Sequence, residues 1–480
     1  MSLDSINYLF FLSVAFAFYW AVPARMNKVR NVLIIAISYA FYALADSRFC
    51  GLLALVSLMT FVVGKVMHTW QKGRYAKCIA AANIVVCLGI LCVFKYLGFF
   101  AEQIAPLVGG GNATHCITRS LVVPVGVSFY VFMAISYTID RYKKVIIESP
   151  SLIDFLAYIS FFPHLLAGPV DRGREMLPQL QKQRSFDYGM AVDGMRQILC
   201  GLFKKVVIAD NVAIIVNNVW NGYTQANTSM LIMAAVLYSI QIYADFSGYS
   251  DMAIGTGKLF GLKMRRNFAY PYFSRNVSEF WRGWHMSLTS WFTEYLYIPL
   301  GGNRKGTMRT IINTLIVFTL CGFWHGANWT FLVWGFLCGV MFIPLLLSNK
   351  LKTRWKGQPL RLDVANVTSM LGTFAVITVC WIVFRAPSMA DAGGYVVSML
   401  NNIHLPLNFS AYGGTISCKP LFILILLIAL IIEWRGRNQE YPLAQIQRLP
   451  VVTRRVAYVA MTLLIMMYTT VSGNFIYQNF

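Results

Sequence analysis

Charged side chains are scarce in this chain. Asp, Glu, Lys and Arg together make up 12% of its 480 residues, whereas hydrophobic residues make up 57%. In soluble proteins roughly a quarter of the residues are charged. This chain has too few charged residues to cover a surface that faces water. The chain is therefore predicted to be all-α and solvated by lipid, as one polytopic helical bundle rather than a string of globular domains.

Acidic residues are scarcer than basic ones. The chain has 19 acidic and 41 basic residues, which gives a net charge of +22. In a soluble protein this excess would suggest nucleic acid as a partner. Here the basic residues lie in short clusters between apolar runs, which is the distribution that orients membrane helices. Membrane lipid, and not nucleic acid, is the predicted surrounding.

Several common functional motifs are missing. The ten cysteines include no CxxC pair, and the sequence has no HExxH motif, no Walker loop and no GxSxG elbow. Neither a disulfide framework nor a metal site is indicated. Phosphoryl transfer, redox chemistry and soluble hydrolase chemistry lose support for the same reason. No bound cofactor is predicted.

Apolar stretches of spanning length, or close to it, recur along the whole chain. A helix needs roughly 20 residues to cross the hydrocarbon core. The first stretch has no basic segment before it and no small-residue cleavage site after it, so a retained helix is expected rather than a signal peptide. The stretches are 6–22, 31–47, 50–66, 78–100, 120–138, 152–169, 206–220, 229–246, 311–325, 327–347, 366–384, 419–433 and 456–473.

The basic clusters predict the topology, because Lys and Arg concentrate in cytosolic loops. Placing them all in the cytosol leaves both termini outside, together with 102–119 and 386–417, which are nearly free of basic residues. Segments 152–169 and 285–303 each lie between two basic loops, so neither can cross once. Re-entrant or broken helices are expected there, around a central tunnel or funnel.

Only six histidines occur, and four of them receive no catalytic role. His68, His115 and His404 fall in polar loops, where a solvated surface position is expected. His164 lies between Phe161 and Pro169, where the chain is expected to turn back, and its role stays open.

His325 lies in Cys-Gly-Phe-Trp-His-Gly-Ala-Asn-Trp, between two strongly apolar segments. Ionisable side chains at such positions are rare and usually face a polar cavity. A neutral imidazole there suits a general base for a hydroxyl group. Gly322 and Gly326 leave room for a substrate or another helix, and Asn328 is placed to orient the ring or to hold a substrate carbonyl. The alternative is a histidine that only hydrogen-bonds two helices together.

His285 belongs to a basic, Trp-rich segment, 274–291. Helical spacing would put Ser278, Arg282 and His285 on one face. An amphipathic interfacial helix at the cytosolic boundary explains this pattern. A cationic mouth for the phosphates of a thioester donor explains it equally well. The residues do not separate the two interpretations.

Asp245 and Asp251 are acidic residues within apolar surroundings. A pair of carboxylates can hold a metal or relay protons. With no histidine near them in the sequence, a buried ion pair with arginines of 265–282 is the favoured interpretation.

Three ordered blocks carry a resemblance to a known family: Trp281–Leu288, Tyr297–Arg304 and Phe323–Thr330. Together they resemble the membrane-bound O-acyltransferase (MBOAT) family, on the branch that O-acetylates alginate. The resemblance implies a single transmembrane acyltransferase domain over 1–480, with a family core at about 5–345 and additional helices and an outer loop at 346–480. The chain departs from the expected pattern at Gly283 and at His164.

The resemblance also implies a mechanism. His325 and His285 match the family's two motif histidines, and His325 would be the catalytic residue in a tunnel that joins the two membrane faces. A cytosolic thioester donor such as acetyl-CoA, with no other cofactor, would bind near Trp281, Arg282 and Arg275. Trp324 and Asn328 complete the implied substrate-binding set.

The implied acceptor is an extracytoplasmic polysaccharide or an SGNH-type acetyltransferase partner, and the implied location is the bacterial inner membrane. Two alternatives remain. One is D-alanyl transfer to teichoic acid within the same family. The other is a transporter or flippase without acyl chemistry, which broken helices and a midplane histidine would also suit.

Overall fold

The computed structural model describes residues 2–69, 74–108, 122–165, 168–348, 363–406 and 420–469. These residues form helices joined by turns, and no β-strand occurs among them. Seven helical stretches of this described part are long and apolar enough to cross a bilayer: Ala24–Thr69, Arg74–Ile104, Thr228–Leu259, Thr307–His325, Trp329–Leu347, Val364–Arg385 and Val451–Tyr468. The predicted helical membrane bundle is confirmed, whereas the re-entrant paths stay a prediction.

The chain divides into two compact units. The first contains the described residues up to Ile198 together with Met252–Arg265, and the second contains Leu199–Asp251 and the described residues from Arg266 onward. His164 belongs to the first unit, and His285 and His325 belong to the second.

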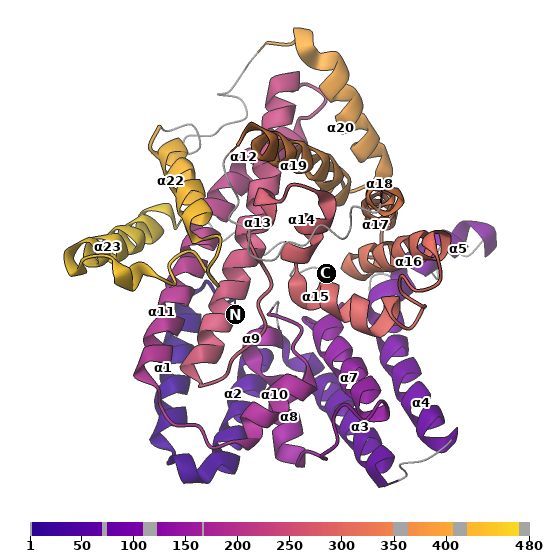
Figure 1. Cartoon of the computed structure of the whole chain (residues 1–480), viewed down its shortest axis with the longest axis vertical. Coiled ribbons are helices and arrows are strands. Elements are labelled where there is room, and N and C mark those ends of the chain that lie inside the picture. The colour runs from indigo at the N-terminus through magenta and orange to yellow at the C-terminus, as the bar shows by residue number, and fades with distance from the viewer. Residues whose placement is uncertain are drawn as a thin grey trace. The chain divides into compact units, whose positions relative to one another are not determined.

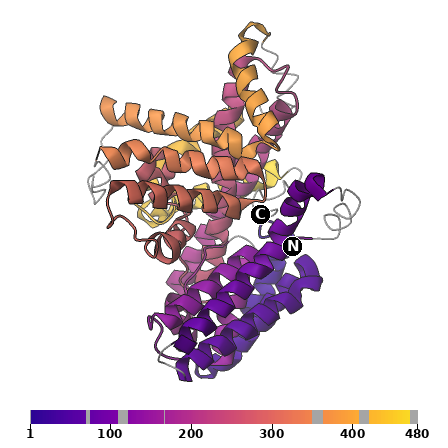
Figure 2. The same cartoon turned by 90° about the vertical axis from the view of Figure 1, so that its right-hand side faces the viewer.

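The first unit is built around α7, which is buried over nearly its whole length. Helices α3, α4 and α7 lie side by side (Figure 2, purple). The helices that begin in this unit are α1 (Ile6–Ala21), α2 (Asn27–Asp46), α3 (Cys50–Thr69), α4 (Arg74–Leu91), α5 (Leu97–Val108), α7 (Val127–Tyr142), α8 (Leu152–Ser160), α9 (Phe162–Leu165), α10 (Gly173–Gln181) and α11 (Tyr188–Leu202).

Close contacts hold α3 and α4 against α7. A Cβ atom at Gly64 of α3 would lie 2.7 Å from the Tyr137 ring, so only glycine allows this approach. The Asn83 amide of α4 donates a hydrogen bond to the Thr138 hydroxyl at 2.7 Å. A buried polar pair of this kind fixes the register of two apolar helices, because shifting it would leave both groups unpaired.

Segment 152–169 is broken, as the sequence predicts. Ser151 caps the start of α8, which ends at Ser160, and Phe162 begins the single turn of α9. His164 is fully buried, and its Nδ1 lies 3.7 Å from Oδ2 of Asp171. Asp171 also accepts a hydrogen bond from the backbone N–H of Arg265 at 2.9 Å. His164 therefore belongs to a buried polar group of the first unit.

The second unit contains the later helices (Figure 1). Among them α16, α17 and α19 pack in a row. The helices are α12 (Asp210–Asn221), α13 (Thr228–Leu259, whose last turns belong to the first unit), α14 (Val277–Gly283), α15 (Met286–Phe292), α16 (Thr307–His325), α17 (Trp329–Val340), α18 (Ile343–Leu347), α19 (Val364–Arg385), α20 (Met389–Asn401), α22 (Pro420–Gly436) and α23 (Val451–Tyr468), with π-helical turns at Phe203–Ala209 and Thr293–Tyr297.

The buried carboxylates of α13 form ion pairs with lysines, where the sequence suggested arginines. Lys204 Nζ lies 3.1 Å from Asp251 Oδ2 and 3.0 Å from Glu433 Oε1. Lys205 Nζ lies 2.8 Å from a carboxylate oxygen of Asp245. Burial alone lowers the pKa of Lys204, but the charges of Asp251 and Glu433 raise it well above its usual value. These are the ion pairs that the sequence favoured over a metal or proton relay, with different cations.

Two predicted outer loops are only partly described. Residues 109–121, which include His115, and residues 407–419 lie outside the described part of the chain. Within 386–417, the structure has the helix α20. The sequence did not predict this helix, because the segment reads as a polar loop rich in Gly and Asn.

Candidate active site

The candidate site is built on the hairpin of α16 and α17, which pack almost backbone to backbone. A Cβ atom at Gly322 would lie 2.2 Å from the carbonyl oxygen of Phe331, and one at Gly335 would lie 2.4 Å from that of Phe318. Such contact is possible only without side chains. Of the two uses predicted for the space at Gly322, the helix contact is the one present.

His325 is the last residue of α16, and the chain leaves the helix in an extended conformation at Gly326. The imidazole is 2% exposed and lies among aromatic rings. Its centroid is 4.9 Å from Trp324, 5.3 Å from Trp334 and 5.5 Å from Phe384. A helix end therefore presents a histidine inside an aromatic wall supplied by α17 and α19.

The segment around His285 differs from its sequence prediction. Instead of one helix over 274–291, α14 ends at Gly283 and α15 begins at Met286. His285 lies in the break with a φ of 43°, in the left-handed region that few residues other than glycine adopt. The face that Ser278 and Arg282 were predicted to share with His285 is therefore not a single helical face.

Asn267 holds this break in place. Its carbonyl accepts a 2.8 Å hydrogen bond from the N–H of Met286, and its Oδ1 accepts one of 2.6 Å from the Ser287 hydroxyl. Its amide donates to the Ser250 hydroxyl of α13 at 2.7 Å. The N–H of Ala269 bonds to the carbonyl of Gly283 at 2.9 Å. A strained backbone conformation of this kind persists only where several surrounding contacts hold it, and the hydrogen bonds of Asn267 are such contacts.

The His285 ring is 2% exposed and packs edge-on against Phe246 of α13, with centroids 4.6 Å apart. Its centroid also lies 6.1 Å from Trp324, which contacts His325 as well. Burial lowers the pKa of His285 to about 3, because a charged imidazole would lose its hydration. His285 is therefore neutral near pH 7 and has one ring N–H to donate.

Both histidines line one cavity of about 270 Å³. Trp281 and Arg282 line it too. Its lining includes the hydroxyl groups of Ser278, Thr289, Thr293, Tyr297 and Thr314. The remaining lining is mostly apolar. Such a cavity, with a few polar groups in an apolar wall, is typical of a small-molecule site.

Three residues of the predicted set do not line this cavity. Arg275 forms an ion pair with Glu279, with 3.0 Å between the guanidinium and carboxylate atoms. Trp324 is buried, and its ring contacts both imidazoles without lining the cavity. Asn328 caps α17 by accepting from the N–H of Thr330, and its amide donates to the carbonyl of Pro387 at 2.9 Å. Asn328 thus shapes the turn after His325 instead of reaching the ring.

A second, smaller hollow of about 70 Å³ adjoins α14. It is lined by Tyr270, Glu279, Arg282 and Arg437, among others. Arg282 is exposed and lines both hollows. Arg437 stacks over Trp434, with its guanidinium carbon 4.1 Å from the ring centroid. Guanidinium groups suit phosphate, because their planar donors match its oxygens.

A family model described as the membrane-bound O-acyltransferase family matches residues 34–355, which is more than half of the chain. The chain belongs to the membrane-bound O-acyltransferase family. It is therefore an acyltransferase, and its apolar helices make it a multi-pass membrane protein.

Curated relatives place this MBOAT protein among bacterial proteins. The chain is 36% identical to the probable alginate O-acetylase AlgI of Azotobacter vinelandii over 407 residues, which cover 84% of this chain and 78% of the relative. It is 32% identical to the peptidoglycan O-acetyltransferase of Helicobacter pylori over 410 residues, which cover 80% and 76%. It is 25% identical to the teichoic acid D-alanyltransferase of Bacillus subtilis over 367 residues, which cover 74% and 90%.

Sequence reasoning missed several residues of this MBOAT site. Phe384 and Arg437 lie beyond the matched region, at the end of α19 and just after α22. Asn267 carries no sequence signal apart from being polar. Two Trp-rich blocks, each with one histidine, signalled Trp281, Arg282 and the two histidines, because such residues are unusual within an apolar chain.

Proposed function

We propose that this acyltransferase is an O-acetyltransferase, which moves an acetyl group from a cytosolic thioester toward an extracytoplasmic carbohydrate. The observation that carries the proposal is the shared cavity of His285 and His325 in a chain of this family. The names of the relatives support acetyl as the acyl group, since one is a probable alginate O-acetylase and the other a peptidoglycan O-acetyltransferase.

His325 is proposed as the general base. Its imidazole takes the proton from an acceptor hydroxyl, whose oxygen attacks the thioester carbonyl carbon. The C–S bond then breaks, the ester C–O bond remains, and the departing thiolate takes the proton from the imidazolium. The enzyme forms no covalent intermediate in this scheme. A buried, apolar cavity favours the transfer because it holds both reactants close and excludes water that would hydrolyse the thioester.

His285 is proposed to assist from the same cavity. The low pKa of His285 keeps its ring neutral, so the ring can donate one hydrogen bond without carrying a positive charge. Aimed at the thioester carbonyl, this N–H would stabilise the negative charge that develops on the oxygen. A single donor of this type contributes about 10²–10³ in rate in other enzymes.

The donor is proposed to be an acyl thioester such as acetyl-CoA. Arg282 supports this assignment, because it lines both the histidine cavity and the neighbouring hollow that contains Arg437. Phosphate groups in that hollow would place the thioester arm along Trp281 toward the histidines. Arg275, whose charge is already paired with Glu279, would then act only through its long-range field.

The acceptor is proposed to be a bacterial polysaccharide such as alginate, reached either directly or through an SGNH-type acetyltransferase, at the inner membrane. We further propose that residues 1–480 act as one domain, in which a family core at 5–345 is completed by the helices of 346–480. Contacts of Phe384 and Trp381 with Trp334 support this, because they join α19 to the hairpin that carries His325.

Two other activities fit the observations less well. D-alanyl transfer to teichoic acid is less favoured, because the identity to the D-alanyltransferase is 25%, compared with 36% and 32% to the O-acetylating relatives. A transporter without acyl chemistry is opposed by the family assignment.

The test is acyl transfer in proteoliposomes, with labelled acetyl-CoA inside and a soluble sugar acceptor outside. His325→Ala should lower acetyl transfer by about 100-fold or more, the usual contribution of a general base. His404→Ala, at an exposed histidine, is the matched control and should retain the wild-type rate. Acetylation by His325→Ala at the wild-type rate would refute the assignment of the base. Absence of any acylated product with the wild type would favour the transporter, and a preference for a D-alanyl donor would favour the teichoic branch.

A further inference from the structure

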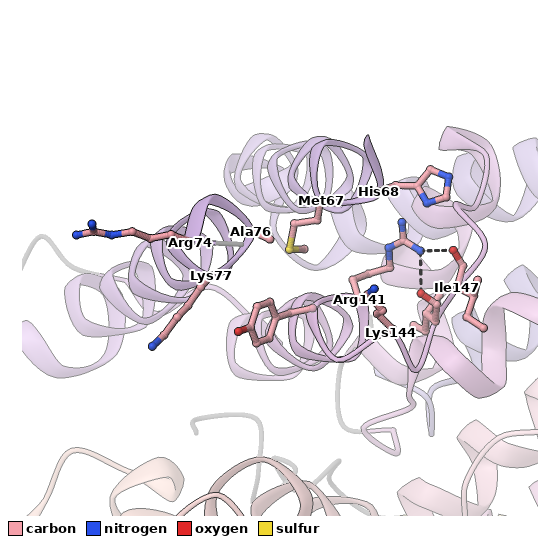
Figure 3. A pocket seen from close by; sticks show the side chains of 10 residues that line it. Met67, His68, Arg74, Ala76, Lys77, Arg141, Lys144 and Ile147 are labelled. Atoms are coloured by element: carbon pink, nitrogen blue, oxygen red, sulfur yellow. Dashed lines mark hydrogen bonds between the residues drawn. The ribbon is translucent and has the colours of Figure 1, made fainter. Parts of the chain in front are cut away.

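A large cavity outside the histidine site lies in the first unit. It has a volume of about 820 Å³, within the range of ligand pockets, and lies between the ends of α3, α4 and α7 (Figure 3). Its side chains come from the last turn of α3, the first turn of α4, the end of α7 and the turn that follows α7. None of these residues is used by the proposed acyl transfer.

The cavity is strongly basic. His68, Arg74, Lys77, Arg141 and Lys144 line it, and no acidic residue of the described chain does so. Arg74, Lys77 and Lys144 are exposed, so their cationic ends remain hydrated and can move. Lys144 also has a φ of 58°, which places it where α7 turns away. An anion that entered this space would meet cations from three separate segments.

Arg141 forms the inner end of the cavity. Its Nη1 donates to the backbone carbonyls of Ile146, Ile147 and Glu148 at 2.8–3.1 Å, and its Nη2 donates to that of Gly64 at 3.2 Å. Figure 3 shows this guanidinium between the helices, with dashed bonds to the turn. Its Nε, although buried, has no hydrogen-bond partner in the described structure. The carbonyls fix the position of the charge without neutralising it, because they are dipoles and not anions.

The remaining lining is apolar: Met67, Ala76, Tyr142, Ile146 and Ile147. The helical stretches that end at Thr69 and begin at Arg74 are candidate membrane spans, and most residues of their apolar windows are not buried by protein. Their polar ends therefore lie where the hydrocarbon core gives way to water. A ligand at this place can hold a charged group against the cations while its chains remain in the bilayer.

We propose that this cavity binds the phosphate-bearing headgroup of an anionic phospholipid. The cations select a phosphate, whose oxygens accept from guanidinium and ammonium groups. The apolar wall and the place between helix ends select a lipid over a free phosphate ester, because only a lipid gains from both surfaces. Basic pockets between membrane helices are suited to such headgroups by their electrostatics. The proposal does not depend on acyl transfer.

The experiment measures lipid retention by native mass spectrometry on the full-length protein purified in mild detergent. Phosphatidylglycerol and phosphatidylcholine, which differ in headgroup charge, are added in equal amounts. We expect the wild type to retain phosphatidylglycerol in preference. The triple variant Arg74→Gln, Lys77→Gln, Lys144→Gln should bind phosphatidylglycerol at least about 10-fold more weakly, since each basic residue near a membrane surface adds to the attraction.

The matched control is Arg25→Gln, Lys28→Gln, Lys182→Gln. It removes the same charge from exposed positions of the first unit that do not line the cavity, and it should retain the wild-type preference. A monodisperse elution profile of each variant shows that it is folded. Equal loss in both triple variants, equal binding of the two lipids, or no loss in the cavity variant would overturn the proposal. Displacement of phosphatidylglycerol by inorganic phosphate or CoA at millimolar concentration would overturn the assignment to a lipid and indicate a soluble phosphate.

Discussion

His285 illustrates how one side chain is constrained by its surroundings. It adopts a left-handed backbone conformation, packs on Phe246 and has a pKa lowered to about 3. In the unfolded chain its pKa is close to 6.5. At a pH between these two pKa values, His285 is protonated in the unfolded chain and neutral in the folded protein.

This difference predicts acid sensitivity. The free energy of unfolding falls as the pH drops below about 6.5, and it is restored as the pH rises. Thermal unfolding in detergent between pH 7 and pH 5 measures the slope. His285→Gln, which cannot take up a proton, should flatten the slope by up to about 1.4 kcal/mol per pH unit. His404→Gln is the control, and a slope unchanged by His285→Gln would contradict the prediction.

Asn267 predicts a positioning effect. Asn267→Ala removes the bonds to the Ser287 and Ser250 hydroxyls, so the turn at His285 loosens. The kcat should fall by about 10- to 100-fold, because small misplacements of reacting groups have effects of that size. The KM for the thioester should change little, since Arg282 is untouched. A merely structural residue would lower the amount of folded protein and leave the kcat of the folded fraction unchanged.

Among single residues, the sequence predicted those cavity residues whose types are rare in an apolar chain. His325, His285, Trp281 and Arg282 stand out in an apolar chain, and the structure brings these four to one cavity. Asn267 did not stand out, because its partners Ser250 and Ser287 lie 17 and 20 residues away and form no motif. The role predicted for Asn328 depends on where its side chain points, which spacing alone does not determine.

The hairpin of α16 and α17 is the element that places His325. Because the two backbones are in contact at Gly322 and Gly335, these helices cannot accommodate an added side chain there without moving apart. The carbonyl oxygen of Phe318 lies 2.4 Å from the position of a Cβ atom at Gly335, and a backbone atom cannot move aside as a flexible side chain can.

Gly335→Ala should therefore separate the helices and displace His325 while leaving its chemistry intact. We expect acetyl transfer to fall about 10-fold or more, together with a lower thermal stability. Gly372→Ala is a control in the middle of α19, where nothing lies within 4 Å of an added Cβ atom. Unchanged transfer by Gly335→Ala would show that the hairpin tolerates a wider spacing.

The π-helical turn at Phe203–Ala209 predicts another element-scale effect. Lys204→Met leaves the buried carboxylates of Asp251 and Glu433 without their shared cation. Removing one partner of a buried pair costs about 3–5 kcal/mol. Glu433→Gln leaves Lys204 paired with Asp251 and should cost less. Thermal unfolding compares the two variants, and the reverse order of stability would contradict this account of the network.

Helices themselves were predictable from apolar length, and their interruptions were only partly so. Pro163 and Gly168 signalled the break after α8. At Trp284 and His285 the pattern of residues remains helical, and the break comes from hydrogen bonds to Asn267, which lies outside the segment. Local sequence cannot report a tertiary contact of this kind.

For the chain as a whole, the C-terminal region packs against the family core and contributes side chains to its buried interactions. The family match ends at residue 355, yet Phe384 contacts His325 and Glu433 pairs with Lys204. The resemblance was looser here, so the sequence offered no reason to connect these helices with the site.

This predicts the behaviour of a truncation. Residues 1–348 alone should show no acetyl transfer, because the aromatic wall around His325 loses α19. Co-expression with 349–480 as a separate chain should restore part of the activity, since the missing contacts are non-covalent. Acetyl transfer by the first fragment alone, at a rate near that of the whole chain, would show that the C-terminal helices are dispensable.

The position of His325 at the very end of α16 has one more consequence. The carbonyl groups of the last turn give a helix C-terminus a partial negative charge, which favours a nearby cation. While the ring is neutral this field does little. In the proposed transfer, the ring takes up the acceptor proton, and the field would stabilise the imidazolium that the buried surroundings oppose. If His325 is the base, as proposed, the helix direction would lower the barrier to proton transfer through its backbone carbonyls and not through another side chain.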